Sequence, residues 1–208
     1  MIYFSFVQVY KEMFARGTYR KHDLVVKLDP DTVFSANRLR ALFADQDLRE
    51  PVLFQNSRFL MGHYSENGTA LHGPMMVVTK TAVEMYRKNF AACDPELHPA
   101  QYNVSSMGED WYIATCLRNL GVEVRFKEKQ LLETRYIAEV KDMHCAYPEV
   151  VAFHPYKSTK RFMQCWTEMR LAELTRTSAG ACRGVSGVHG HSWFNLIATP
   201  EYPKPYMK

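Results

Sequence analysis

The sequence contains no apolar run long enough to cross a membrane, and its N-terminus lacks the pattern of a signal peptide. It also lacks a strong charge imbalance, because 26 lysines and arginines stand against 22 aspartates and glutamates, for a net charge of +4. Basic residues gather only weakly, at 125–129 and 157–161, which is too little to indicate a nucleic-acid-binding protein. The mild positive balance is compatible with an anionic substrate but does not require one.

Cysteine is scarce, and its spacing excludes a C-x-x-C metal motif and a dense disulfide framework. Two interpretations remain open: one or two disulfides in a secretory lumen, or five buried thiols in cytosol. Because the count is odd, at least one cysteine has no partner within the chain. The five are Cys93, Cys116, Cys145, Cys165 and Cys182.

A chain of 208 residues with 47% hydrophobic residues is long enough for one domain with a substantial core. Residues 3–14 have apolar side chains at helical spacing and predict an amphipathic helix. A chain that opens within a helix is expected to be a fragment of a longer protein. Glycine, serine, histidine and then proline dominate from residue 178, so we expect a domain over residues 1–176 and a flexible tail over 177–208.

The strongest motif is a short apolar, β-branched run over residues 24–28 that ends at two carboxylates, Asp29 and Asp31. The run predicts a buried strand, and Pro30 predicts that the strand stops there. Because side chains alternate along extended chain, the two carboxylates are expected on the same side. Paired carboxylates at a strand end suit Mg²⁺ or Mn²⁺ carrying substrate phosphates. The alternative is that both aspartates only form a turn.

A second motif opens a predicted helix with two acids, Glu109 and Asp110. Ser106 and Glu109 have the spacing of a capping box, and Gly121 is a candidate C-terminal cap. Acids in a first helical turn are favoured by the helix dipole in any helix. Glu109 and Asp110 are therefore either catalytic candidates or capping residues alone.

A third motif is an apolar run over residues 151–153 that ends in His154 and is followed by Lys157. This predicts another strand end with ligand chemistry, although a histidine after an apolar run is often structural. Together, the three motifs contain the parts for sugar transfer from a nucleotide diphosphate. A metal neutralises the leaving diphosphate, a carboxylate deprotonates the acceptor hydroxyl, and a lysine adds positive charge.

The order of these motifs resembles the fringe and beta-1,3-galactosyl- and N-acetylglucosaminyltransferase group of inverting glycosyltransferases. The resemblance covers roughly residues 1–170, in close relatives of algal and protist type, and its most specific part is the acid-rich helix. The matching segments are KLDPDTVF at 27–34, GPMMVVTKTAVE at 73–84, GEDWYIATCLRNLGV at 108–122 and AFHPYK at 152–157.

This resemblance implies a role for each candidate residue. Asp31 and His154 would be metal ligands, and Asp29 would be the acid nearer the ribose and the waters of the metal. Lys157 would reach the diphosphate. Asp110, beside Glu109, would be the catalytic base. Cys116 would be a luminal disulfide cysteine.

The resemblance also implies a GT-A-like (Rossmann-like) α/β fold, with a mixed sheet flanked by helices. The cofactor would be Mn²⁺ or Mg²⁺, the donor a UDP-sugar, and the acceptor a glycan or glycoprotein in the Golgi or endoplasmic-reticulum lumen. Membrane attachment would come only through an anchor that this chain lacks. The family's nucleotide-binding strands precede the D-x-D segment and are missing here, so we expect an N-terminal truncation. Trp111 stands where better-known members have a small β-branched residue.

Two other functions compete with this one. The segment over 24–33 also resembles motif I of the haloacid-dehalogenase phosphatases, in which Asp29 would be the nucleophile, Asp31 an acid/base and Mg²⁺ the cofactor. That function leaves the segment from His154 to Lys157 unexplained. Alternatively, the chain is an inactive, truncated transferase that acts as a glycan- or partner-binding module.

Overall fold

The computed structural model describes residues 2–57, 71–102, 108–133 and 145–181. The helices are α1 (Ile2–Arg16), α2 (Ala36–Leu42), α3 (Lys80–Lys88), α4 (Glu109–Asn119) and α5 (Thr159–Ala181), with short 3₁₀ helices η1 (Thr18–Lys21) and η2 (Phe90–Cys93). The strands are β1 (Leu24–Leu28), β2 (Val33–Phe34), β3 (Val52–Gln55), β4 (Met75–Thr79), β5 (Glu123–Phe126), β6 (Leu131–Glu133) and β7 (Ala152–His154).

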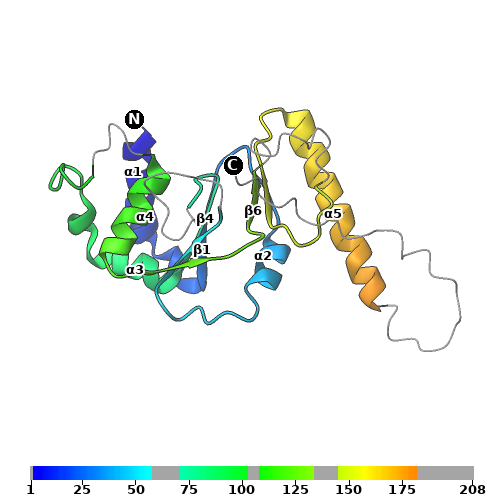
Figure 1. Ribbon diagram of the computed structural model, residues 1–208, viewed down its shortest axis with the longest axis horizontal. Coiled ribbons are helices and arrows are strands. Elements are labelled where there is room, and N and C mark those ends of the chain that lie inside the picture. Colours follow the sequence, from blue (N-terminus) through cyan, green and yellow to red (C-terminus); the bar gives the residue numbers. More distant parts are fainter. Residues whose placement is uncertain (1, 58–70, 103–107, 134–144, 182–208) are drawn as a thin grey trace, which may run out of the picture.

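The strands form two mixed sheets. The larger has the order β1-β4-β3-β5, in which β4 is antiparallel to both β1 and β3 while β3 and β5 are parallel. The smaller has the order β2-β7-β6, with β2 antiparallel and β6 parallel to β7. The protein is therefore a mixed α/β structure with mixed sheets flanked by helices, as the sequence predicts at this level (Figure 1).

The central strands β3 and β4 are buried throughout because both of their faces are covered. Side chains alternate between the two faces of a strand. Leu53 and Val78 pack with helices α1, α3 and α4, whereas Phe54 and Val77 pack on the other face, with Leu39 of α2. An alternating polar pattern is therefore absent from both strands.

Helices α1, α3 and α4 lie together on one side of the larger sheet, and α5 lies at the opposite end of the molecule, beside the smaller sheet (Figure 1). Helix α5 closes a separate core in which Met169 and Cys165 pack against Val33 and Phe153. This helix runs to Ala181, so it extends five residues past the domain boundary expected at 176. Residues 182–208 of the expected tail lie outside the described residues.

Capping explains several helix boundaries. The Ser35 hydroxyl accepts a bond from the Arg38 amide at the start of α2, and Thr79 caps α3 in the same way. Gly121 follows α4 with a φ of 82°, a left-handed conformation that favours glycine, so its predicted role as a C-terminal cap is confirmed. Ser106 of the predicted capping box lies outside the described residues. Gly108 is the N-cap of α4, and Glu109 is the first helical residue rather than the third.

Two disulfides join segments that are distant in sequence. Cys93 bonds to Cys116 and ties the end of η2 to α4, and Cys145 bonds to Cys165 of α5. The prediction that Cys116 is disulfide-bonded is confirmed. The fifth cysteine, Cys182, lies outside the described residues.

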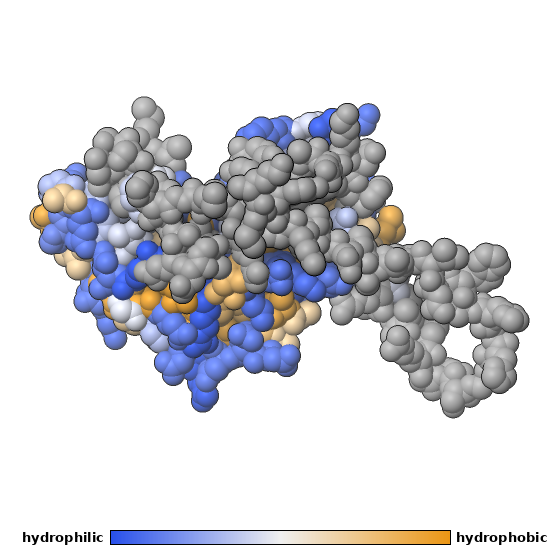
Figure 2. All heavy atoms as spheres, viewed as in Figure 1, coloured by the Kyte–Doolittle hydropathy of each residue, from blue (hydrophilic) through white to orange (hydrophobic). Residues whose placement is uncertain are grey.

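The visible face carries hydrophilic side chains over much of its described surface, with hydrophobic atoms showing in the area where β1 and α2 lie (Figure 2). Strand β1 lies at the edge of the larger sheet and all five of its residues are only half-buried, so the prediction of a buried strand over 24–28 is wrong as to burial. Among the described helices, none combines the length and the hydrophobicity that a membrane span requires.

Candidate metal and acid site

The loop after β1 carries Asp29 and Asp31 and is fixed by backbone bonds. The Asp29 amide donates to the Pro74 carbonyl at 3.0 Å, and the Thr32 amide donates to the Asp29 carbonyl at 3.0 Å. The first contact exists because β1 runs antiparallel to β4, so the end of β1 lies beside the start of β4. The predicted strand end is confirmed, and both carboxylates lie beyond it.

The end of β7 meets this loop because β7 pairs with β2, which follows directly from Asp31 and Thr32. His154 Nε2 lies 3.3 Å from Asp31 Oδ1, and Lys157 Nζ lies 3.1 Å from Asp31 Oδ2. The Tyr156 amide also donates to the Asp31 backbone carbonyl at 2.8 Å. Two of the three sequence motifs therefore converge on one carboxylate.

Asp29, Asp31 and His154 can each direct one ligand atom to a common point, since these atoms lie within 4.8 Å of one another. Two carboxylates and one imidazole are a donor set that suits Mn²⁺, and the oxygens also suit Mg²⁺. Burial acts to raise the pKa of Asp31, but the hydrogen bond from Lys157 and the charge of His154 outweigh burial and lower it. The residues present thus fit a divalent cation.

Lys27 connects the metal-binding candidates to the acid-rich helix. Its ammonium lies 2.5 Å from Asp29 Oδ1 and 2.9 Å from Glu109 Oε1, and it donates to the Gly73 carbonyl at 2.7 Å. Burial lowers the pKa of Lys27, but the hydrogen bonds to Asp29 and Glu109 outweigh burial and raise it. A lysine with three acceptors fixes the end of β1 against the first turn of α4.

Glu109 and Asp110 are adjacent in sequence but differ in their surroundings. Burial acts to raise the pKa of Glu109, yet the hydrogen bond and charge of Lys27 lower it overall. For Asp110 the result is opposite, because burial raises the pKa more than the bond from the Trp111 amide lowers it, and the charge of Glu109 raises it further. The surroundings therefore make Asp110 more basic than an ordinary aspartate and Glu109 less basic than an ordinary glutamate.

Backbone amides orient the Asp110 carboxylate. Oδ2 accepts from the Gly73 amide at 3.1 Å and Oδ1 accepts from the Trp111 amide at 2.8 Å. A Cβ atom at position 73 would stand 3.2 Å from Asp110 Oδ2 and 3.3 Å from Glu109 Oε1, so glycine permits this close approach. The interpretation of the two acids as capping residues alone does not account for their contacts with Lys27 and Gly73.

A pocket of about 240 Å³ opens beside Asp110. Its lining includes four groups that can hold a polar ring: an indole, a carboxylate, an imidazole and a guanidinium. The residues that line it are Leu71, His72, Gly108, Asp110, Trp111, Ala114 and Arg118.

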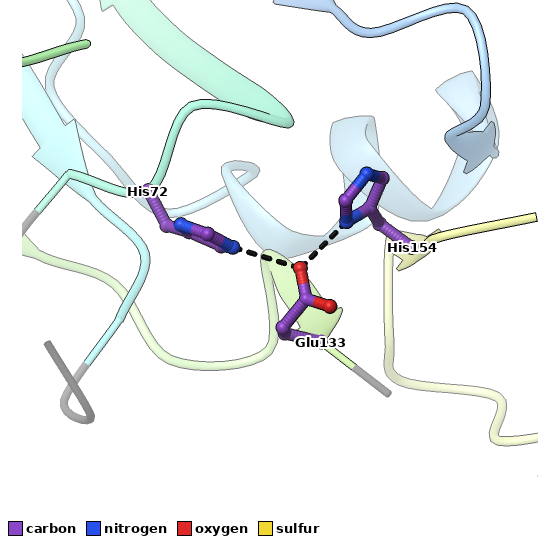
Figure 3. A group of neighbouring side chains, drawn as sticks. All are labelled: His72, Glu133 and His154. Carbon is purple, nitrogen blue, oxygen red and sulfur yellow. Dashed lines mark hydrogen bonds and ion pairs between the residues drawn. The ribbon is translucent and has the colours of Figure 1, made fainter. Parts of the chain in front are cut away.

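Sequence analysis assigned no role to three residues of this region: Lys27, His72 and Glu133. Glu133 lies between two imidazoles, with Oε2 at 2.6 Å from His154 Nδ1 and 2.7 Å from His72 Nε2 (Figure 3). Signals for two of them exist in the sequence. Lys27 is a lone charge inside an apolar strand, and Glu133 follows two leucines in the same apolar-then-acid pattern as Asp29.

Comparison of the chain with protein-family models and with curated proteins returns no match.

Proposed function

We propose that the protein is a metal-dependent inverting glycosyltransferase with a GT-A-like fold. It moves a hexose or N-acetylhexosamine from a UDP-sugar to a hydroxyl group of a glycan or glycoprotein. The observation that carries the proposal is the convergence of Asp31, His154 and Lys157 at neighbouring strand ends, linked through Lys27 to the helix that carries Asp110. The motif order that resembles this family supports the same function.

In this proposal, Asp29, Asp31 and His154 hold Mn²⁺ or Mg²⁺, which supplies charge neutralisation for the diphosphate of the donor. Lys157 is largely exposed at the rim, so its ammonium can leave Asp31 and bind the diphosphate. A long, flexible lysine side chain is suited to that movement.

Asp110 acts on the acceptor side. Its carboxylate takes the proton of the acceptor hydroxyl as the new bond forms between that oxygen and the anomeric carbon of the sugar. The bond from that carbon to the phosphate oxygen breaks, and UDP leaves with the electron pair. The raised pKa of Asp110 makes the carboxylate a better proton acceptor than an exposed aspartate. The pocket beside it holds the acceptor ring, with Trp111 as an apolar surface.

The two disulfides support a location in the secretory lumen, where disulfides form and persist. The Golgi or the endoplasmic reticulum is the compartment that this proposal assigns.

The test is calorimetric titration of the purified protein with UDP, with and without Mn²⁺. We expect binding that requires Mn²⁺ and that Asp31→Ala abolishes. Asp47→Ala is the matched control, because it removes an aspartate that is also paired with a cation, Arg49, but on an exposed surface. UDP binding that is unchanged in Asp31→Ala would contradict the assignment.

The alternatives give different results. An inactive binding module would bind UDP or a glycan without transferring sugar from any UDP-sugar. A phosphatase of the haloacid-dehalogenase type would form an aspartyl-phosphate on Asp29 when incubated with a phosphate ester and Mg²⁺, and mass spectrometry would detect that adduct.

A further inference from the structure

Glu133 is the buried centre of a three-residue cluster with His72 and His154. Figure 3 shows its carboxylate between the two rings, at the end of β6, with His154 at the end of the neighbouring strand β7. The exposed fractions are 8% for Glu133, 3% for His154 and 9% for His72. A buried carboxylate requires hydrogen-bond donors, and the two rings supply them.

Both contacts use the same carboxylate oxygen. Oε2 lies 2.6 Å from His154 Nδ1 and 2.7 Å from His72 Nε2. An ionised carboxylate can only accept hydrogen bonds, so the nitrogen that faces it on each ring carries the proton. The tautomer of each imidazole is then set by Glu133.

For His154 this has a direct consequence. A metal ion binds the lone pair of an imidazole nitrogen, so the ring proton must be on the other nitrogen. Nε2 is the nitrogen that faces Asp31, at 3.3 Å from Oδ1, and Nδ1 is the one that donates to Glu133. Glu133 thus keeps the proton on the nitrogen that does not face the candidate cation site.

The same three residues have the composition of a cation site of their own, since one ligand atom from each lies within 4.8 Å of the others. Their distances favour hydrogen bonds instead. Ligands bound to one Zn²⁺ at about 2.0–2.2 Å in tetrahedral geometry stand about 3.3–3.6 Å apart. The contacts at 2.6 and 2.7 Å are shorter than that and fall in the range of charge-assisted hydrogen bonds.

We propose that Glu133 is a positioning residue that orients His154 for the divalent cation and, through His72, ties that orientation to the pocket beside Asp110. His72 lines this pocket, so one carboxylate connects the cation side with the acceptor side. The inference rests on the proposed function, because it requires His154 to bind a cation.

The experiment is Mn²⁺ titration of the purified protein and of Glu133→Gln, followed by electron paramagnetic resonance of the free ion. Glutamine keeps the size of the side chain, but its amide can donate to His154 Nδ1 and so move the ring proton to Nε2. We expect Mn²⁺ binding to weaken about 10- to 100-fold, the usual effect of removing a residue that orients a metal ligand. Glu149→Gln is the matched control, because Glu149 is exposed and paired with Lys129, and we expect no change in Mn²⁺ binding there.

A second measurement separates positioning from general support of the fold. Nitrogen-15 spectra of the imidazole rings identify which nitrogen carries the proton in the Mg²⁺-loaded protein. We expect the proton on Nδ1 of His154 and on Nε2 of His72, with signals assigned by His154→Gln and His72→Gln. In Glu133→Gln we expect loss of the Nδ1-protonated form of His154, while thermal unfolding still shows a folded protein.

The outcomes distinguish the two proposals. If the unaltered protein binds no Mn²⁺, the proposed function fails and takes the role of Glu133 with it. If Mn²⁺ binds and Asp31→Ala abolishes binding while Glu133→Gln leaves it unchanged, only the role of Glu133 is overturned. Stoichiometric Zn²⁺ binding that requires His72 and Glu133 but not Asp31 would also overturn it, because the cluster would then be a metal site.

Discussion

Lys27 Nζ lies 2.9 Å from Glu109 Oε1, which joins the edge strand β1 to the first turn of α4. The same ammonium lies 2.5 Å from Asp29 Oδ1. Because Lys27 pairs with Glu109, the two adjacent acids of α4 have different electrostatic surroundings. Glu109 forms an ion pair with a lowered pKa, whereas Asp110 has a raised pKa and faces the pocket.

Asp110→Asn should lower turnover by about 10²–10⁴-fold, the usual loss when a general base is removed. UDP binding should survive, because Asp110 is not among the residues that can bind the cation. Under the proposed mechanism, kcat/KM of the unaltered protein should fall as the pH drops, with an apparent pKa above that of an ordinary aspartate, since burial raises the pKa of Asp110. Steady-state transfer kinetics from a UDP-sugar over a pH series measures both effects.

Glu109→Gln is the neighbouring control for that prediction. It removes the ion pair with Lys27 but keeps the size of the side chain, so we expect turnover within about tenfold of the original, a change near 1.4 kcal/mol. Loss of turnover in Glu109→Gln together with a silent Asp110→Asn would place the base one residue earlier. If neither variant lowers turnover while the unaltered protein is active, the proposed mechanism is refuted.

Lys27→Met should destabilise the fold, because it leaves the partly buried carboxylates of Asp29 and Glu109 without their shared cation. A hydrogen bond to a charged group contributes about 1.5–3 kcal/mol, so we expect a loss of about that size in the free energy of unfolding. Urea titration followed by circular dichroism measures it. Lys21→Met removes an exposed lysine and should change stability by less than about 0.5 kcal/mol.

The disulfide between Cys93 and Cys116 should be intact in protein from a secretory host. Replacing both cysteines with alanine should lower the free energy of unfolding by about 3 kcal/mol, because the bond closes a loop with a sequence separation of 23 residues. Mass spectrometry of non-reduced peptides identifies the pairing and thermal unfolding measures the loss. Free thiols at both positions throughout the population would contradict the structure and weaken the luminal assignment.

Glu84 should make the free energy of unfolding depend on pH in the acidic range. The hydrogen bonds from Arg87 and Tyr19 lower the pKa of Glu84 to about 2. Because the folded-state pKa lies below that of the unfolded chain, the stabilisation is complete above pH 4.5, the ordinary value, and is lost as the pH falls toward 2. Glu84→Gln should therefore reduce stability at neutral pH and flatten its fall in acid. Urea midpoints measured at several pH values test this. The exposed Glu96→Gln is the control, and its urea midpoint should fall with pH as steeply as that of the unaltered protein.

Local pattern was sufficient for elements whose cause lies within a few residues. The apolar run before Asp29 predicts β1, the serine at position 35 predicts the start of α2, and Gly121 predicts the end of α4. In each case a short-range rule acts alone: alternation along a strand, a hydroxyl that caps a helix, or a glycine at positive φ. The same rules identified Asp31 and His154 as candidates, each at the end of an apolar run.

Tertiary structure decided which of these residues meet and what each carboxylate does. Asp31 and His154 are 123 positions apart in sequence and come together only because β2 pairs with β7. Glu109 and Asp110 differ in their contacts and in the direction of their pKa shifts. Lys27 of β1 contacts Glu109, and Gly73, which lies just before β4, contacts Asp110. Glu133 lies outside the sequence motifs and His72 immediately precedes the segment at 73–84, yet both contact the site. Sheet pairing and burial are properties of the whole fold, so no local spacing encodes the electrostatic role of these side chains.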